Sequence, residues 1–187
     1  MDLSILSKNW GTVYLGLYDV AIGTVTGILL YVIVRDEAAL GFIVTTASVL
    51  AMIASLYAIP ILKKFPSSFW VGSIGSAVSI IVFALNQSPA GVWAYILISG
   101  LTVPLVTNKF STVYFRTLDQ APGNWRHKYH LLIERDVVLG VFRTLSYVGL
   151  FIFLGFGTEI AIAKSWLLFL PIIPIGIGLL IDKTIHA

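Results

Sequence analysis

Residues Leu131 to Phe153 read LLIERDVVLGVFRTLSYVGLFIF, and this stretch decides how the rest of the chain is interpreted. Its charged triplet, Glu134 to Asp136, precedes an apolar run that is long enough to cross a bilayer and contains Arg143. Asp136, Gly140 and Arg143 share one helical face, because steps of three and four residues return to the same side. An arginine in mid-span costs about 2.5 to 3.5 kcal/mol, so Arg143 needs a carboxylate, a backbone partner or a watery cavity.

The composition is that of a protein whose solvent is lipid. Hydrophobic residues make up 58% of the chain and charged residues 11%, with a mean hydropathy of +0.94. An average soluble domain has about 25% charged residues. The 187 residues leave room for about six spans of ~20 residues, which predicts one all-α bundle. The absence of cysteine excludes disulfides and thiolate metal sites.

The six predicted spans are separated by short polar turns, with one longer connection. We expect the spans at residues 11–34, 39–62, 69–85, 90–107, 137–156 and 166–181, after an interfacial lead-in over residues 1–10. The connection over residues 108–136 is basic, and helix should continue into it from both sides of a break at residues 121–124, with Asn124 as the second helix cap. A turn containing Glu159 and Lys164 is expected before the last span, which Pro171 and Pro174 should loosen.

Small residues within the spans predict close helix packing. Gly23 and Gly27 form a GxxxG spacing, which favours a close helix neighbour at that point. The third span carries a face of glycine and serine suited to the same purpose, formed by Gly72, Ser73, Gly75, Ser76 and Ser79.

The basic residues are distributed unequally between the two sides of the predicted bundle. Nine of the 12 Lys and Arg fall on the side of the termini, namely Lys8, Lys63, Lys64, Lys109, Arg116, Arg126, Lys128, Arg135 and Lys183. Only Arg35 and Lys164 fall on the other side, and Arg143 lies within a span. This bias predicts cytoplasmic termini and explains the pI of 9.2 without nucleic acid as a partner.

Asp19 and Arg143 are the unlike charges placed inside two spans. Asp19 lies about 12 Å along the first span and Arg143 about 9 Å along the fifth, both counted from the predicted cytoplasmic side at 1.5 Å per residue. The similar depths predict an ion pair if these two helices are neighbours. Two interpretations stay open: a salt bridge that only locks the bundle, or a pair that exchanges a proton or breaks as the protein changes state.

The segment Arg135 to Arg143, RDVVLGVFR, resembles the R-E-x-x-L-N-x-G-R signature of the eleventh helix in one branch of bacterial major facilitator superfamily transporters. Arg135, Leu139 and Arg143 match, Asp136 replaces Glu, and Gly140 and Phe142 depart from the Asn and Gly. The turn over residues 63–66, KKFP, is similar to the superfamily's connection between helices eight and nine. The resemblance implies the C-terminal six-helix half of such a transporter, built from two inverted three-helix repeats.

The resemblance also implies a function. As a transporter half, the chain is expected to move a small solute by alternating access, with a partner half supplied by a second copy, another polypeptide or the rest of a longer chain. The expected pathway residues are Asp19, Arg143, Tyr18 and Gly140, and the expected cytoplasmic gate is Arg135 with Asp136. The alternative is a membrane scaffold or accessory subunit that transports nothing, in which these charges are purely structural.

Other classes of function find little support in the sequence. All three histidines, His127, His130 and His186, fall outside the predicted spans, and neither an H-E-x-x-H nor a G-x-S-x-G pattern is present, so we expect no enzyme, no metal site and no cofactor. Channel filters and the repeated motif of mitochondrial carriers are also absent. Aromatic residues in the spans offer stacking surfaces for a sugar, drug or peptide, namely Tyr14, Tyr18, Tyr31, Trp93 and Tyr147.

Overall fold

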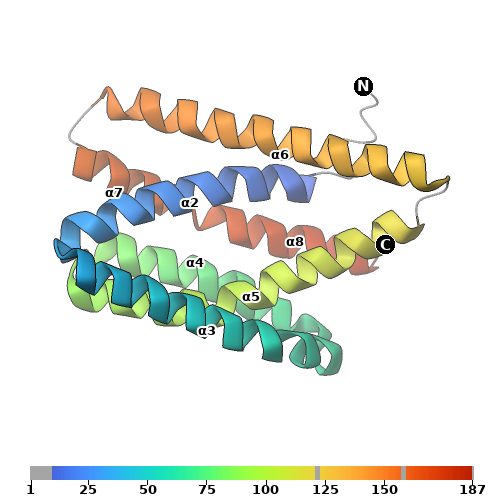
Figure 1. Ribbon diagram of the computed structural model, residues 1–187, viewed down its shortest axis with the longest axis horizontal. Helices are drawn as coiled ribbons and strands as arrows, with labels where there is room; N and C mark the ends of the chain where they lie inside the picture. The colour runs from blue at the N-terminus through green and yellow to red at the C-terminus, as the bar shows by residue number, and fades with distance from the viewer. Residues whose placement is uncertain (1–9, 121–122, 157–158, 187) are drawn as a thin grey trace.

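A computed structural model describes residues 10–120, 123–156 and 159–186, except for the side chains of residues 10, 11, 19–22, 117, 159, 160, 162, 163 and 184–186. The regular structure in these ranges is helical (Figure 1) and comprises α2 (Trp10–Val34), α3 (Glu37–Lys64), η1 (Pro66–Ser68), α4 (Phe69–Leu85), α5 (Pro89–Gln120), α6 (Trp125–Leu154), α7 (Glu159–Phe169) and α8 (Ile172–His186). Six helical stretches are long and apolar enough to cross a bilayer. The chain is therefore a multi-pass membrane protein, as its composition predicts.

Capping residues set the starts of two helices. Asp36 caps α3, because its Oδ1 accepts hydrogen bonds from the backbone N–H groups of Ala38 at 2.9 Å and Ala39 at 3.3 Å. Asn124 caps α6, because its Oδ1 accepts a hydrogen bond from the N–H of His127 at 3.2 Å. The cap predicted at Asn124 is confirmed, and α5 and α6 both extend into the connection over residues 108–136.

The last span differs from the prediction. Glu159 and Lys164 were expected in a turn, but both lie within helix α7, and the chain breaks later, between α7 and α8. The predicted turn is wrong, but the loosening predicted at Pro171 is confirmed. Pro171 disfavours helical backbone at Leu170 and offers no N–H to the preceding turn. Pro174 lies in the first turn of α8, where a proline removes no intrahelical hydrogen bond.

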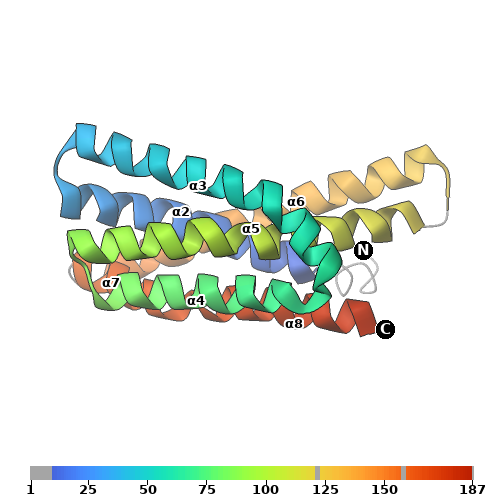
Figure 2. The same cartoon turned by 90° about the horizontal axis from the view of Figure 1, so that it is seen from below.

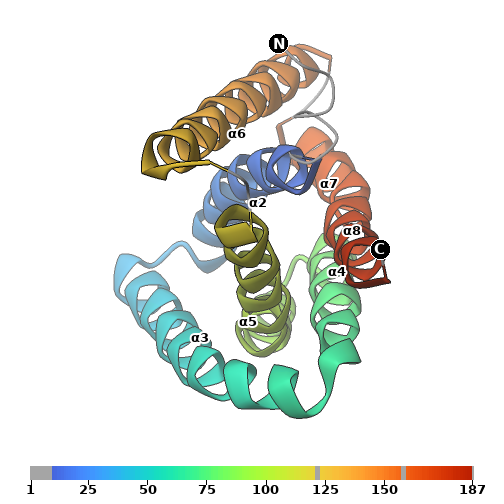
Figure 3. The ribbon, with the colours of Figure 1, turned by 90° about the vertical axis from the view of Figure 1, so that its right-hand side faces the viewer.

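Two helices occupy the centre of the bundle and two lie at its edge. Viewed end-on, α2 and α5 lie centrally, α6 flanks α2, α3 flanks α5, and α4 with α7 and α8 completes the other side (Figure 3). Only 6% of the most apolar window of α3 and 11% of that of α6 is buried, against 50% for the window of η1 and α4. Figure 2 shows α5 and α6 running together past the end of α3.

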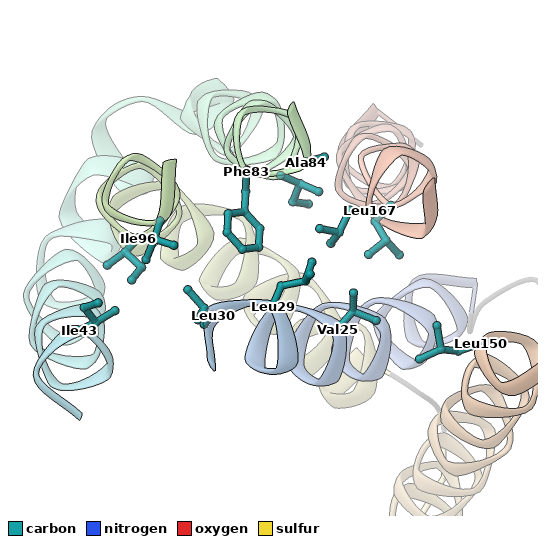
Figure 4. Close-up of a cluster of buried hydrophobic side chains, with 12 residues drawn as sticks. Val25, Leu29, Leu30, Ile43, Phe83, Ala84, Ile96, Leu150 and Leu167 are labelled. Atoms are coloured by element: carbon teal, nitrogen blue, oxygen red, sulfur yellow. The ribbon is translucent and has the colours of Figure 1, made fainter. Parts of the chain in front are cut away.

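The core consists of two clusters of buried apolar side chains. The larger joins α2, α3, α4, α5, α6 and α7 through residues that include Val25, Leu29, Phe83, Ile96 and Leu167 (Figure 4). The smaller lies toward the other end of the bundle and includes Leu62, Phe69, Val106, Ile177 and Ile181. These clusters position the central helices, on which the candidate site is built.

The helices approach most closely at glycines. A Cβ at Gly72 would lie 2.8 Å from the backbone nitrogen of Val106, so α4 and α5 touch backbone to backbone, as the small-residue face of the third span predicts. The close neighbour expected at Gly23 and Gly27 is not found: among the described residues, no atom lies within 4 Å of a Cβ at either position. On α2 the close contact is instead at Gly16, where a Cβ would lie 3.0 Å from the carbonyl oxygen of Leu139 in α6.

Candidate functional site

The pair of helices α2 and α6 carries the intramembrane charges expected from the sequence. Besides the contact at Gly16, the Ser146 hydroxyl of α6 donates a hydrogen bond to the carbonyl oxygen of Leu17 at 3.3 Å. The Thr24 hydroxyl on α2 and the Tyr147 hydroxyl on α6 are hydrogen-bonded at 3.1 Å. The predicted neighbourhood of the first and fifth spans is therefore confirmed.

Arg143 and Asp19 lie on these two neighbouring helices. Arg143 is half-buried, and its backbone nitrogen lies 3.5 Å from the position of a Cβ at Gly16. Asp19 follows Gly16 by three residues within α2, and its side chain is outside the part of the chain that the structure describes. Helices α2 and α6 thus contact each other near the depth of Asp19 and Arg143, and the ion pair itself stays a prediction.

Small exposed residues leave one side of the α2–α6 pair open. Gly140 on α6 is exposed and, like Gly23 and Gly27, has no described atom within 4 Å of where a Cβ would be. The Thr24–Tyr147 hydrogen bond is also partly exposed. We call these exposed positions, Gly23, Gly27, Gly140 and Tyr147, the open side of the α2–α6 pair, and take them as the candidate pathway surface.

Tyr18 points into the bundle interior rather than onto this surface. It packs against the larger core cluster, and its hydroxyl approaches that of Ser76 on α4. Tyr95 on α5 stacks on Phe83 at a centroid distance of 5.1 Å, and its hydroxyl approaches that of Thr26 without completing a hydrogen bond. Four hydroxyl groups from three helices therefore meet inside the membrane bundle. Sequence reasoning missed this cluster, because only packing across helices brings its members together.

The expected gate residues lie where α6 leaves the bundle. The Arg135 guanidinium lies over the ring of Tyr114 on α5, 4.9 Å from its centroid. Its Nε is 3.9 Å from Oδ1 of Asp136, whose side chain is 72% exposed, against 32% for Arg135. Lys128 adds a second link by donating a hydrogen bond from Nζ to the carbonyl oxygen of Asp119 at 2.8 Å. Arg135 thus joins α6 to α5, and Asp136 faces outward.

Of the other aromatic residues that could stack on a solute, two pack against neighbouring helices and two are exposed on the surface. Tyr14 packs on Gly176 of α8, and Trp93 stands edge-on to Phe42 at 6.1 Å. Tyr31 is exposed on α2, and Tyr147 is exposed beside Thr24. Of these four aromatics, Tyr147 therefore belongs to the open side of the α2–α6 pair.

The chain matches no family model, no curated protein and no solved structure. The functional argument therefore rests on the arrangement of its own residues.

Proposed function

We propose that the chain is a six-helix half of a secondary transporter, similar to the C-terminal half of a major facilitator, that moves a small solute across the cell membrane by alternating access with a partner half. Both termini lie in the cytoplasm in this proposal. The single observation that carries it is the way in which the helices pair.

The main helix contacts keep their pattern when the first three spans exchange places with the last three, although the smaller contact of α5 with α8 has no counterpart of that size between α2 and α4 among the described residues. Under this exchange α2 replaces α5, α3 replaces α6, and α4 replaces α7 and α8. The α2–α6 contact then becomes the α5–α3 contact, and the α4–α5 contact becomes that of α7 and α8 with α2. The contact of α4 with α7 and α8 maps onto itself. This pattern is what two three-helix repeats would produce, and an odd number of spans per repeat inverts one relative to the other.

The open side of the α2–α6 pair supplies half of a pathway. Gly140 lies three residues before Arg143 on α6 and has no described atom within 4 Å of where a Cβ would be, and the half-buried position of Arg143 favours a polar or watery environment on this side. A partner half would close the pathway from the opposite side. The link between Arg135 and Tyr114 suits a gate, because it joins α5 to α6 at one end of the bundle through a contact between exposed helix extensions.

Cysteine labelling tests this proposal directly, because the natural chain contains no cysteine. Gly140→Cys probes the open side, and Val148→Cys on the same helix is the matched control. With a membrane-impermeant thiol reagent and the chain in native membranes, we expect Gly140→Cys to react and Val148→Cys to stay unlabelled. Equal protection of both cysteines would contradict an aqueous pathway and favour the scaffold.

Flux measurements test the transport step itself. Proteoliposomes are assayed for uptake of a panel of labelled sugars, amino acids and organic cations. We expect uptake of at least one compound, abolished by Asp19→Asn with normal insertion of the variant. Absence of uptake across the panel, together with loss of expression in Asp19→Asn, would indicate that the charge only stabilises the bundle.

A further inference from the structure

A crevice runs between α6 and the broken last span, apart from the proposed pathway. It has a volume of about 430 Å³, with α2 as its floor. Leu145 and Phe153 of α6 face Trp166 and Phe169 of α7 across it, and Ile173 of α8 continues the wall. In Figure 3 α6 stands apart from α7 with α2 between them, which agrees with this placement.

The wall of the crevice offers almost nothing to a polar solute. Of its two polar side chains, Ser146 already donates to the Leu17 carbonyl oxygen. The other is Trp166, whose buried indole nitrogen has no acceptor within the described residues. Trp166 stands edge-on to Phe153 with a centroid distance of 5.6 Å. An apolar occupant with an acceptor at one end matches this chemistry.

The length and volume of the crevice match a single hydrocarbon chain. From Phe153, next to the end of α6, to Phe142 is about 16 Å at 1.5 Å per residue, close to the ~15 Å hydrocarbon depth of one leaflet. A helix about 10 Å across and of that length would occupy about three times the volume of the crevice. A single acyl chain therefore suits the crevice better than a helix of a second copy of the chain.

The position of Trp166 indicates which end of the crevice lies at the level of the lipid headgroups. Trp166 lies two residues after Lys164, where the candidate span Lys164–Lys183 begins. Tryptophan at the end of a span lies at headgroup depth, where phospholipid ester oxygens are also found. An ester oxygen at this depth is an acceptor of the kind that the indole N–H lacks among the described residues.

We propose that this crevice binds one acyl chain of a phospholipid from the leaflet at the α6–α7 end of the bundle, with its ester group beside Trp166. The chain fills the space between α6 and α7–α8 and couples α6, which has few other neighbours, to the last span. The proposal rests on the membrane location of the protein and is independent of transport.

Two tryptophan substitutions on α6 provide the test. Leu145 lines the crevice and Val148 does not, although both are about half exposed. Each variant and the natural chain are reconstituted into phosphatidylcholine vesicles, extracted with a mild detergent and examined by native mass spectrometry for retained phospholipid. We expect one phospholipid on the natural chain and on Val148→Trp, and at least tenfold lower retention on Leu145→Trp.

Three outcomes would overturn the proposal: equal retention by the two variants, no retained phospholipid on the natural chain, or detergent in place of phospholipid. Folding of the variants is checked by helical circular dichroism. If Leu145→Trp fails this check, Phe142→Trp, at another residue that lines the crevice, takes its place with the same expected result.

Discussion

The contact between α4 and α5 at Gly72 gives the sharpest test of the packing. In Gly72→Ala the new methyl group would lie 2.8 Å from the nitrogen of Val106, 2.9 Å from the Leu105 Cβ and 2.9 Å from the Thr102 carbonyl oxygen. Ordinary contact begins at 3.4 Å, so the two helices must separate by at least about 0.6 Å. Two of the three obstacles are backbone atoms, which no rotamer change can move. Overpacking of this kind costs about 1 to 3 kcal/mol.

The assay is reversible unfolding with SDS in mixed micelles, followed by far-ultraviolet circular dichroism. Gly23→Ala is the matched control, since no described atom lies within 4 Å of its new methyl group. We expect the free energy of unfolding to fall by about 1 to 3 kcal/mol for Gly72→Ala and to change by less than about 0.5 kcal/mol for Gly23→Ala. A Gly72→Ala protein as stable as the natural chain would refute the close backbone contact, and an equally large loss in Gly23→Ala would refute the open side of α2.

Three further substitutions test individual contacts. Asp36→Ala removes the N-cap of α3 and should lower the free energy of unfolding by about 1 kcal/mol, with Asp36→Asn close to the natural chain in the same SDS titration. Tyr114→Leu removes the ring under Arg135 and should lower the free energy of unfolding by about 0.5 to 1 kcal/mol in the same SDS titration. Tyr114→Phe keeps the ring face and should lower it by less. The reverse order of the two variants would contradict the cation–π contact. Tyr147→Phe removes the hydrogen bond to Thr24 and should lower the free energy of unfolding by about 0.5 to 1.5 kcal/mol, whereas no change would show that this bond does not hold α6 to α2.

The spans could be predicted from the sequence because lipid imposes a length and a composition on them. The third span, residues 69–85, coincides with α4, and the cap at Asn124 follows from local chemistry. The last span, predicted over residues 166–181, falls within the candidate span Lys164–Lys183. What was wrong is the turn before it, because Glu159 and Lys164 have the charges of a turn but lie within α7, which continues to Phe169.

The candidate site was predictable only where it depends on position along a helix. The similar depths of Asp19 and Arg143 could be counted from the sequence, whereas the contact between their helices at Gly16 could not. Sequence spacing could not show that Tyr18 turns toward Ser76 or that Tyr114 lies under Arg135, because both contacts depend on how separate helices are rotated and aligned. The prediction at Gly23 and Gly27 failed for the same reason, because a GxxxG spacing does not show whether another helix packs against it.

The interleaved helix pairs constrain how the protein is made. The main neighbour of α3 is α5, and that of α2 is α6. Each of these early helices can therefore pack against its main neighbour only after that later helix has been synthesised. When α4 has left the ribosome, neither α2 nor α3 has met this neighbour, and both are surrounded by lipid. We therefore expect the first three spans to form no stable intermediate on their own, and the bundle to assemble once α5 and α6 have entered the bilayer.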